Sequence, residues 1–163
     1  MSQVELDRID KGVLHFLQQD ARNATTTEMG ERIGVAASTI RNRIERLEQE
    51  GVIRGYQPEI DYGAVGLSLH MVFNCSLRDG GPSEGDVDSV FEDVLSVQGV
   101  IAVRELLSDS ENIHVEAVGT DVDDLTRIAD DLRSRGLTID RSDVLKRHDH
   151  RPYRCFAETT FSP

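Results

Sequence analysis

The residues best suited to chemistry in this sequence lie in one stretch, residues 37–49. Apolar side chains recur there at Ile40, Ile44 and Leu47, a spacing that predicts a helix with one buried face. Its other faces carry hydroxyl, amide and guanidinium groups, on Ser38, Thr39, Arg41, Asn42, Arg43 and Arg46. Such groups bind phosphate oxygens and base edges, so this helix is a candidate for reading DNA. The alternative is an ordinary solvated helix face.

The residues that flank this helix favour the DNA interpretation. Thr25 and Glu28 stand three residues apart, which is the capping-box signature of a helix start. Gly34 follows that short helix where a tight turn is needed, and Gly51 predicts the end of the second helix. A short helix, a glycine turn and a longer polar-faced helix make a helix–turn–helix, whose second helix enters the major groove of DNA.

Within this arrangement the polar side chains divide by the contacts that they suit. We expect Ser38 and Thr39 to contact phosphates, and Asn42 and Arg46 to contact base edges. The residues that follow the second helix are expected to be extended. In winged helix proteins such a segment lies near the DNA backbone, so Arg54 is either a phosphate contact or a solvated side chain.

The apolar spacing divides the chain into two domains. Residues 1–20 have helical spacing and are expected to pack on the helix–turn–helix as the third helix of one core. Residues 57–66 contain proline and glycine, and beyond them the spacing changes to two-residue, which marks a boundary. The elements predicted after it are strand 67–77, helix 87–95, strands 100–107 and 112–118, helix 122–132 and strand 138–146.

Strand–helix–strand–strand–helix–strand is the order of the ferredoxin-like arrangement. The predicted fold is therefore α+β, with an N-terminal winged helix–turn–helix domain followed by a ferredoxin-like βαββαβ domain. We place the DNA-binding domain at residues 1–56, a linker at 57–66 and the ferredoxin-like domain at 67–147. Residues 148–163 are expected to form a tail or an added edge strand.

The charge of the chain is unusual for a DNA-binding protein, which is normally basic. It has 30 acidic and 18 basic residues and a net charge of −12. The acid is thinned where DNA would lie, since residues 34–47 carry three arginines and one glutamate. The only lysines are Lys11 and Lys146. An acidic surface with few lysines suggests adaptation to a very salty cytoplasm and a halophilic archaeal source; the alternative is an acidic mesophilic protein.

Several other classes of protein are disfavoured by the sequence. It has no run of eighteen apolar residues and no secretory signal, so we expect a cytoplasmic protein without membrane spans. The two cysteines, Cys75 and Cys155, are expected to stay reduced, with Cys75 in the core. No phosphate loop, His–Glu–x–x–His or nucleophile elbow occurs, so we expect no catalytic residue, cofactor or metal. His148, His150 and Cys155 have the residue types of a metal site, with a charged tail as the alternative.

Two stretches resemble the Lrp/AsnC family, the leucine-responsive and asparagine-synthase-type transcription regulators of bacteria and archaea. They are LDRIDKGVLHFLQQDAR from Leu6 to Arg22 and GVAASTIRNRIERLEQEGVIRGY from Gly34 to Tyr56. The resemblance implies palindromic sites in double-stranded DNA. It also implies a homodimer held through the C-terminal sheets and assembled further into tetramers or octamers, with a small-molecule effector between C-terminal domains.

The sequence departs from the family pattern in two places. The family's effector pattern, a Gly followed by an aromatic residue and Asp, lies near the hairpin between the second and third strands. The matching stretch here has neither the Gly nor the aromatic residue, and its candidate effector ligands are Asp109, Ser110, Glu111 and Asn112. The second departure is Ala36, where the family commonly has a serine as the helix N-cap.

Two other functions share this architecture. Sirohaem decarboxylases resemble it, and their activity goes with a His–Asn–Tyr–x–Arg stretch on the second strand. Here that stretch is Val100–Ile101–Ala102–Val103–Arg104, which retains only the arginine. An effector-binding module without a DNA role is disfavoured by the arginine-bearing helix. The DNA-binding regulator is the favoured interpretation.

Overall fold

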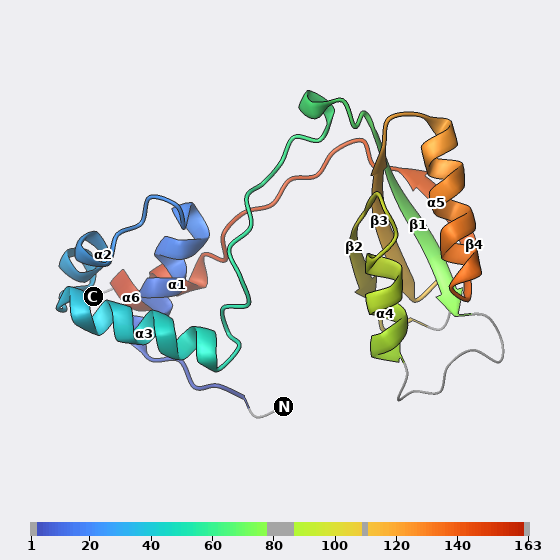
Figure 1. Ribbon diagram of the computed structural model, residues 1–163. Coiled ribbons are helices and arrows are strands. Elements are labelled where there is room, and N and C mark those ends of the chain that lie inside the picture. The colour runs from blue at the N-terminus through green and yellow to red at the C-terminus, as the bar shows by residue number, and fades with distance from the viewer. Residues whose placement is uncertain (1–2, 78–86, 109–110, 162–163) are drawn as a thin grey trace. The chain divides into compact units, whose positions relative to one another are not determined.

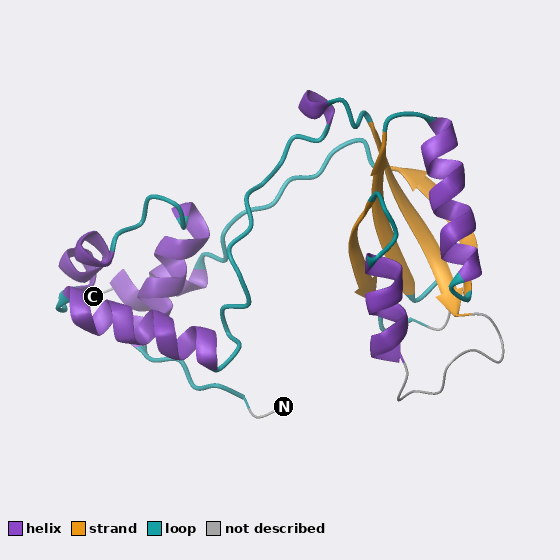
Figure 2. Cartoon of the chain, in the orientation of Figure 1, coloured by secondary structure: helices purple, strands orange, loops and turns teal. Residues whose placement is uncertain are grey.

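The computed structural model describes residues 3–77, 87–108 and 111–161. The chain forms two compact units (Figures 1 and 2). The first unit comprises Met1–Pro58 together with Asp149–Pro163, and the second comprises Glu59–His148. None of the described helices combines the length and the apolar character needed to cross a membrane.

The first unit is built on α1 (Arg8–Asp20), α2 (Thr26–Ile33) and α3 (Ala37–Gln49). One face of each helix is apolar, and these faces meet in a common core. The buried members of that core are Val13, Leu14, Phe16, Met29, Ile33, Ile40 and Leu47. The predicted three-helix core is confirmed.

Helix α2 has one half of the predicted capping box at its start and the predicted glycine turn at its end. The Thr25 side chain accepts a hydrogen bond from the backbone N–H of Glu28 at 3.1 Å, which caps the start of α2. Gly34 ends α2 in the left-handed conformation, with φ 85°. At Gly30 a Cβ atom would lie 2.6 Å from the carbonyl oxygen of Val35, so only glycine allows this close approach. Ala36 begins α3 without a side-chain cap.

The C-terminal residues differ from the expected tail or edge strand. They contain the helix α6 (Cys155–Phe161), which packs on α1 within the first unit (Figure 1). Thr160 is buried, and the guanidinium of Arg8 donates to its carbonyl oxygen at 3.5 Å. The ring of Phe161 packs edge-on against the ring of Phe16, with centroids 5.9 Å apart. A helix of seven residues is too short for its apolar spacing to be recognised in the sequence. Packing against α1 stabilises it instead.

The second unit has the predicted ferredoxin-like order of elements. It contains β1 (Leu69–Leu77), α4 (Val87–Leu95), β2 (Val100–Glu105), β3 (Ile113–Gly119), α5 (Val122–Ser134) and β4 (Leu137–Val144). The strands form one antiparallel sheet in the order β2-β3-β1-β4. Side chains of α4 and α5 share a core with one face of this sheet.

Cys75 lies in this core, as predicted, and is fully buried. Burial raises the pKa of its thiol to about 12. The thiol is therefore protonated near neutral pH, and its role is packing.

The sheet face away from α4 and α5 carries buried polar side chains. Glu116 on β3 is 5% exposed. Its carboxylate accepts a hydrogen bond from Arg104 Nη1 at 2.7 Å and lies 2.7 Å from His70 Nε2. Asn74 on β1 is 1% exposed and donates to Asp143 on β4 at 2.8 Å. These pairs join all four strands of the sheet on the face opposite α4 and α5.

Replacing Glu116 with glutamine is expected to destabilise the second unit in a pH-dependent way. Burial alone would raise the pKa of Glu116, but the hydrogen bonds from Arg104 and His70 outweigh it and hold the pKa below its ordinary value of 4.5. Because the folded pKa is depressed, the contribution to stability is complete above about pH 4.5 and is lost as the pH falls through the folded pKa. The unfolding temperature of Glu116→Gln should therefore fall below that of the wild type near neutral pH, and the difference should shrink in acid.

Thermal unfolding between about pH 3 and pH 7 measures this difference. Glu92→Gln, which changes an exposed carboxylate on α4, is the matched control and should show little effect. A Glu116→Gln deficit that stays constant across the whole pH range would contradict the explanation.

Candidate nucleic-acid interface

The exposed side of α3 carries the groups that suit DNA. Ser38, Arg41, Asn42 and Glu45 are exposed there, while Ile40 on the opposite side is fully buried. We call these four exposed residues the reading face. The side chains of Arg41 and Asn42 make no hydrogen bond or ion pair within the described part of the chain, so their polar groups are available to a partner. Thr39 is only half-buried and lies at the edge of this face.

Two of the predicted DNA-binding arginines lie elsewhere. Arg43 Nη1 is 2.8 Å from Asp7 Oδ2 and 3.2 Å from Asp10 Oδ1, which ties it to the start of α1. Arg46 Nη2 is 2.6 Å from Asp10 Oδ2, and the Nε and Nη2 atoms of Arg46 are buried. The spacing of the apolar residues placed Arg46 on a polar face of α3, but its long side chain turns toward a buried carboxylate on the neighbouring helix.

The two aspartates that hold these arginines also form the N-terminal cap of α1. The Asp7 side chain accepts from the backbone N–H of Asp10 at 2.9 Å, and Asp10 Oδ2 accepts from the backbone N–H of Asp7 at 2.9 Å. This is a reciprocal capping box. We call Asp7, Asp10, Arg43 and Arg46 the α1–α3 ion-pair network.

The charges of this network reinforce one another. Burial alone would raise the pKa of Asp7, but hydrogen bonds within the capping box and the nearby Arg43 lower it. The Asp10 carboxylate, which accepts from the Arg46 guanidinium, raises the pKa of Arg46 above its ordinary value. Both shifts favour the charged forms of Asp7 and Arg46.

Asp10 was overlooked in the sequence, although a signal was present. Leu6, Asp10, Val13 and Leu17 are spaced four, three and four apart, so an acidic residue occupies an inward position of α1. Asp10 is 0% exposed. A carboxylate in an apolar stripe predicts a buried cationic partner, which α3 provides.

The segment beyond α3 was predicted to be extended, but it begins with a turn and a bend over residues 50–53, and it carries the last predicted DNA contact. Arg54 is exposed, in agreement with either a phosphate contact or a solvated side chain. Tyr56 lies nearby, and its hydroxyl donates to Glu48 on α3 at 2.9 Å. Burial and the carboxylate of Glu48 together raise the pKa of Tyr56 to about 12. This bond fixes the direction in which the chain leaves α3.

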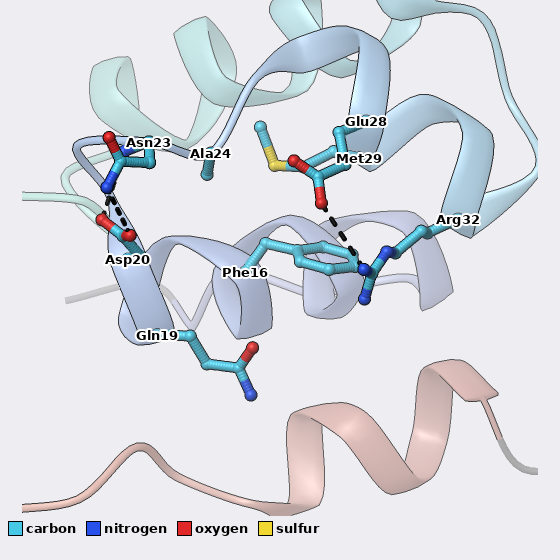
Figure 3. A pocket seen from close by; sticks show the side chains of 8 residues that line it. All are labelled: Phe16, Gln19, Asp20, Asn23, Ala24, Glu28, Met29 and Arg32. Atoms are coloured by element: carbon cyan, nitrogen blue, oxygen red, sulfur yellow. Dashed lines mark hydrogen bonds and ion pairs between the residues drawn. The ribbon is translucent and has the colours of Figure 1, made fainter.

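A pocket of the first unit lies between α1 and α2 (Figure 3). Its carboxylates already have partners, because Asn23 donates to Asp20 at 2.7 Å and Arg32 lies 3.5 Å from Glu28. The guanidinium of Arg32 also stacks over the ring of Phe16, 5.7 Å from its centroid. The paired charges of this open pocket give no ligand an unpaired charged group to bind.

The predicted effector residues are only partly described. Asp109 and Ser110 lie outside the described residues. Glu111 has a left-handed backbone with φ 51°, and its carboxylate is 3.8 Å from Arg141 on β4. The carbonyl of Asn112 accepts from the backbone N–H of Leu106 at 2.7 Å, which closes the hairpin. These two residues thus shape the turn between β2 and β3.

The residues weighed for other chemistry have structural partners. Arg104, the one residue kept from the decarboxylase pattern, is paired with Glu116. Among the described residues, no group of three or more His, Cys, Asp or Glu side chains could hold a metal ion.

Comparison with known proteins agrees with the geometry of both units. The family described as winged helix-turn-helix DNA-binding matches residues 6–54. An HTH-type transcriptional regulator of Pyrococcus abyssi is 31% identical over 128 residues, which are 78% of this chain and 80% of that protein. The leucine-responsive regulatory protein of Rhizobium meliloti is 44% identical over 66 residues, which are 40% of this chain and 42% of that protein.

A solved structure extends the similarity to the whole fold. The crystal structure of a transcriptional regulator from Neisseria meningitidis, in complex with L-Met, matches 90% of this chain and 94% of that chain. Its TM-score is 0.71 and its sequence identity is 25%. The helix–turn–helix, the four-stranded antiparallel sheet and these matches together show that the chain belongs to the Lrp/AsnC family of DNA-binding transcription regulators.

Proposed function

We propose that this chain is a cytoplasmic transcription regulator that reads palindromic double-stranded DNA through the reading face of α3. The observation that supports it best is the exposure of Arg41 and Asn42, without protein partners, in the N-terminal half of the second helix of a helix–turn–helix. An arginine and an amide side chain are the groups that pair with guanine and adenine edges. As a regulator the protein is expected to have no catalytic activity and no cofactor.

We assign DNA binding to the first unit and oligomerisation to the second. The sheet face away from α4 and α5 carries Val72 and Val118 beside the buried Glu116 and Asn74. Glu116, Asn74 and Val118 are already buried within one chain, and a second copy packed on this face would also cover the half-buried Val72. The resulting dimer would present two copies of α3 about one DNA turn apart, as a palindromic site requires. Tetramers or octamers would form from such dimers.

A small-molecule effector is the third part of the proposal. The Neisseria meningitidis relative was solved with L-Met, so an amino acid is the first class of effector to test. In this chain the β2–β3 hairpin offers Glu111 and Asn112, together with the Asp109 and Ser110 that complete the predicted set. Binding there would act on DNA through the arrangement of the dimer.

Selection of genomic fragments tests the DNA function directly. The purified full chain, in about molar KCl, is incubated with fragments that include the promoter of its own gene. Selective retention of a few fragments is the expected result. A folded, oligomeric protein that retains all fragments equally, or none, would contradict the proposal.

The acidic surface suggests that the protein works in a very salty cytoplasm, as in a halophilic archaeon. At about 1 M salt the Debye length is near 3 Å, so the repulsion between this surface and DNA is screened. Counterion release weakens at the same time. We therefore expect operator affinity to fall less steeply with salt than that of a basic homologue. Titrations from low to molar KCl measure the slope, and a steep conventional decline would rule the idea out.

A further inference from the structure

Asp10 is a buried carboxylate whose partners come from two helices. It is 0% exposed and lies at the third position of α1. Within α1 it accepts from the backbone N–H of Asp7 at 2.9 Å. Two arginines of α3 contact it: Arg43 Nη1 lies 3.2 Å from Asp10 Oδ1, and Arg46 Nη2 lies 2.6 Å from Asp10 Oδ2. Removing a carboxylate from water is costly, so this group is stable only while its cationic partners stay in place.

The two arginines fix α3 on one side. They are three residues apart, so they lie one turn from each other on the same edge of the helix. The buried Ile40 and Leu47 hold α3 on a neighbouring side through the core. A helix held by apolar contacts alone can rotate about its axis, because such contacts have no preferred direction. The hydrogen bonds that Arg43 donates to Asp10, and the short ion pair of Arg46 with the same fixed carboxylate, do have a preferred direction.

The reading face lies on the same helix as this edge. Arg41 and Asn42 directly precede Arg43, so any rotation of α3 turns their side chains relative to the rest of the unit. Bidentate contacts with base edges depend on such orientation.

We propose that Asp10 is a positioning residue for DNA recognition, which sets the orientation of α3 through Arg43 and Arg46. The inference rests on the proposed reading of DNA by α3. Asp10 itself is buried and touches no DNA. Arg43 and Arg46, which the sequence suggested as DNA contacts, act on recognition through Asp10.

Charge and position predict opposite effects when Asp10 is changed. Asp10→Asn removes one negative charge from the DNA-binding unit, and less repulsion would by itself strengthen binding to any DNA. The positioning role predicts weaker binding to the selected operator fragment. The amide oxygen of asparagine can still accept from the N–H of Asp7, so the cap of α1 is preserved.

The test compares Asp10→Asn with Glu31→Gln, which removes one negative charge from the exposed surface of α2. Both full-length variants are titrated with the operator fragment and with unrelated DNA of equal length. We expect Asp10→Asn to lose about tenfold or more in operator affinity, the size of a misplaced base contact. The affinity of Asp10→Asn for unrelated DNA should stay equal or rise. Glu31→Gln should keep its affinity for both the operator and unrelated DNA.

A second variant covers the case in which Asp10→Asn does not fold. Arg46→Lys keeps the charge but loses the planar guanidinium that contacts Asp10. It should likewise lose operator affinity while keeping its affinity for unrelated DNA. The double variant Asp10→Asn/Arg46→Lys should lose less operator affinity than the sum of the two single losses, because both substitutions act through one contact. Undiminished operator affinity in a folded Asp10→Asn or Arg46→Lys variant would overturn the proposal. A wild type that selects no fragment would instead overturn the proposed DNA function.

Discussion

Replacing Arg41 and Asn42 with alanine is expected to abolish selective DNA binding without changing the stability of the protein. Both side chains are exposed and make no hydrogen bond or ion pair in the described part of the chain, so their removal costs the fold little. Each good base contact contributes about 1–3 kcal/mol of discrimination, so the double variant should lose operator affinity by about 100-fold or more. Titration of the operator fragment measures the loss, and thermal unfolding checks the fold.

The control for this variant is Gln98→Ala/Arg133→Ala, which removes one amide and one arginine from the exposed surface of the second unit. It changes the net charge equally, so it separates loss of a specific contact from loss of positive charge. Equal weakening in both double variants would show that α3 does not read the sequence. By contrast, Arg43→Ala/Arg46→Ala should lower stability as well as DNA affinity, because it leaves the buried carboxylate of Asp10 without a cation.

Ending the chain after His148 is expected to destabilise the DNA-binding unit and leave the ferredoxin-like unit unchanged. The truncation removes α6, whose Phe156 packs against the core of the first unit and whose Thr160 is buried against α1. It also removes a carbonyl acceptor of Arg8. Because burying an apolar side chain contributes about 1.5–3 kcal/mol, the expected loss is about 2–4 kcal/mol. Amide hydrogen exchange should then quicken in α1 and not in α5.

Two neighbouring residues of α6 provide a milder, matched comparison. Thr160 is 4% exposed, whereas Thr159 is on the solvent side of the same helix. Thr160→Ala should therefore quicken exchange in α1, and Thr159→Ala should not. Equal exchange in the truncated and complete chains would mean that α6 does not contribute to the first unit.

Much of the fold could be predicted because its signals are local. The strand β1 shows its buried face in Phe73 and Cys75, which alternate with polar residues as the pleat of a strand requires. The turn before α3 shows itself in Gly34, whose left-handed backbone favours glycine. Patterns of this kind depend on a few neighbouring residues, so one sequence is enough to find them.

The missed features depend on contacts between distant residues. Whether Arg46 points to DNA or to protein is decided by Asp10, which lies 36 positions earlier in the chain. Residues 155–161 form a helix because they pack on α1, from which they are separated in the sequence by the entire second unit. A helical wheel gives the direction of a Cβ atom, and a long arginine side chain can still turn toward a carboxylate beside it. The sequence could therefore predict the helix that carries the candidate site, but not the ion pairs that its arginines form.

Cross-linking from α3 to DNA tests the central claim most directly. A photoreactive amino acid is placed at Asn42 in the reading face and, in a second protein, at the exposed Thr126 on α5. Each is irradiated with the selected operator fragment and with unrelated DNA. We expect an efficient cross-link from position 42 to bases of the operator, with little to unrelated DNA and none from position 126. Cross-links from position 126 alone, or equal cross-links from position 42 to both DNAs, would contradict it.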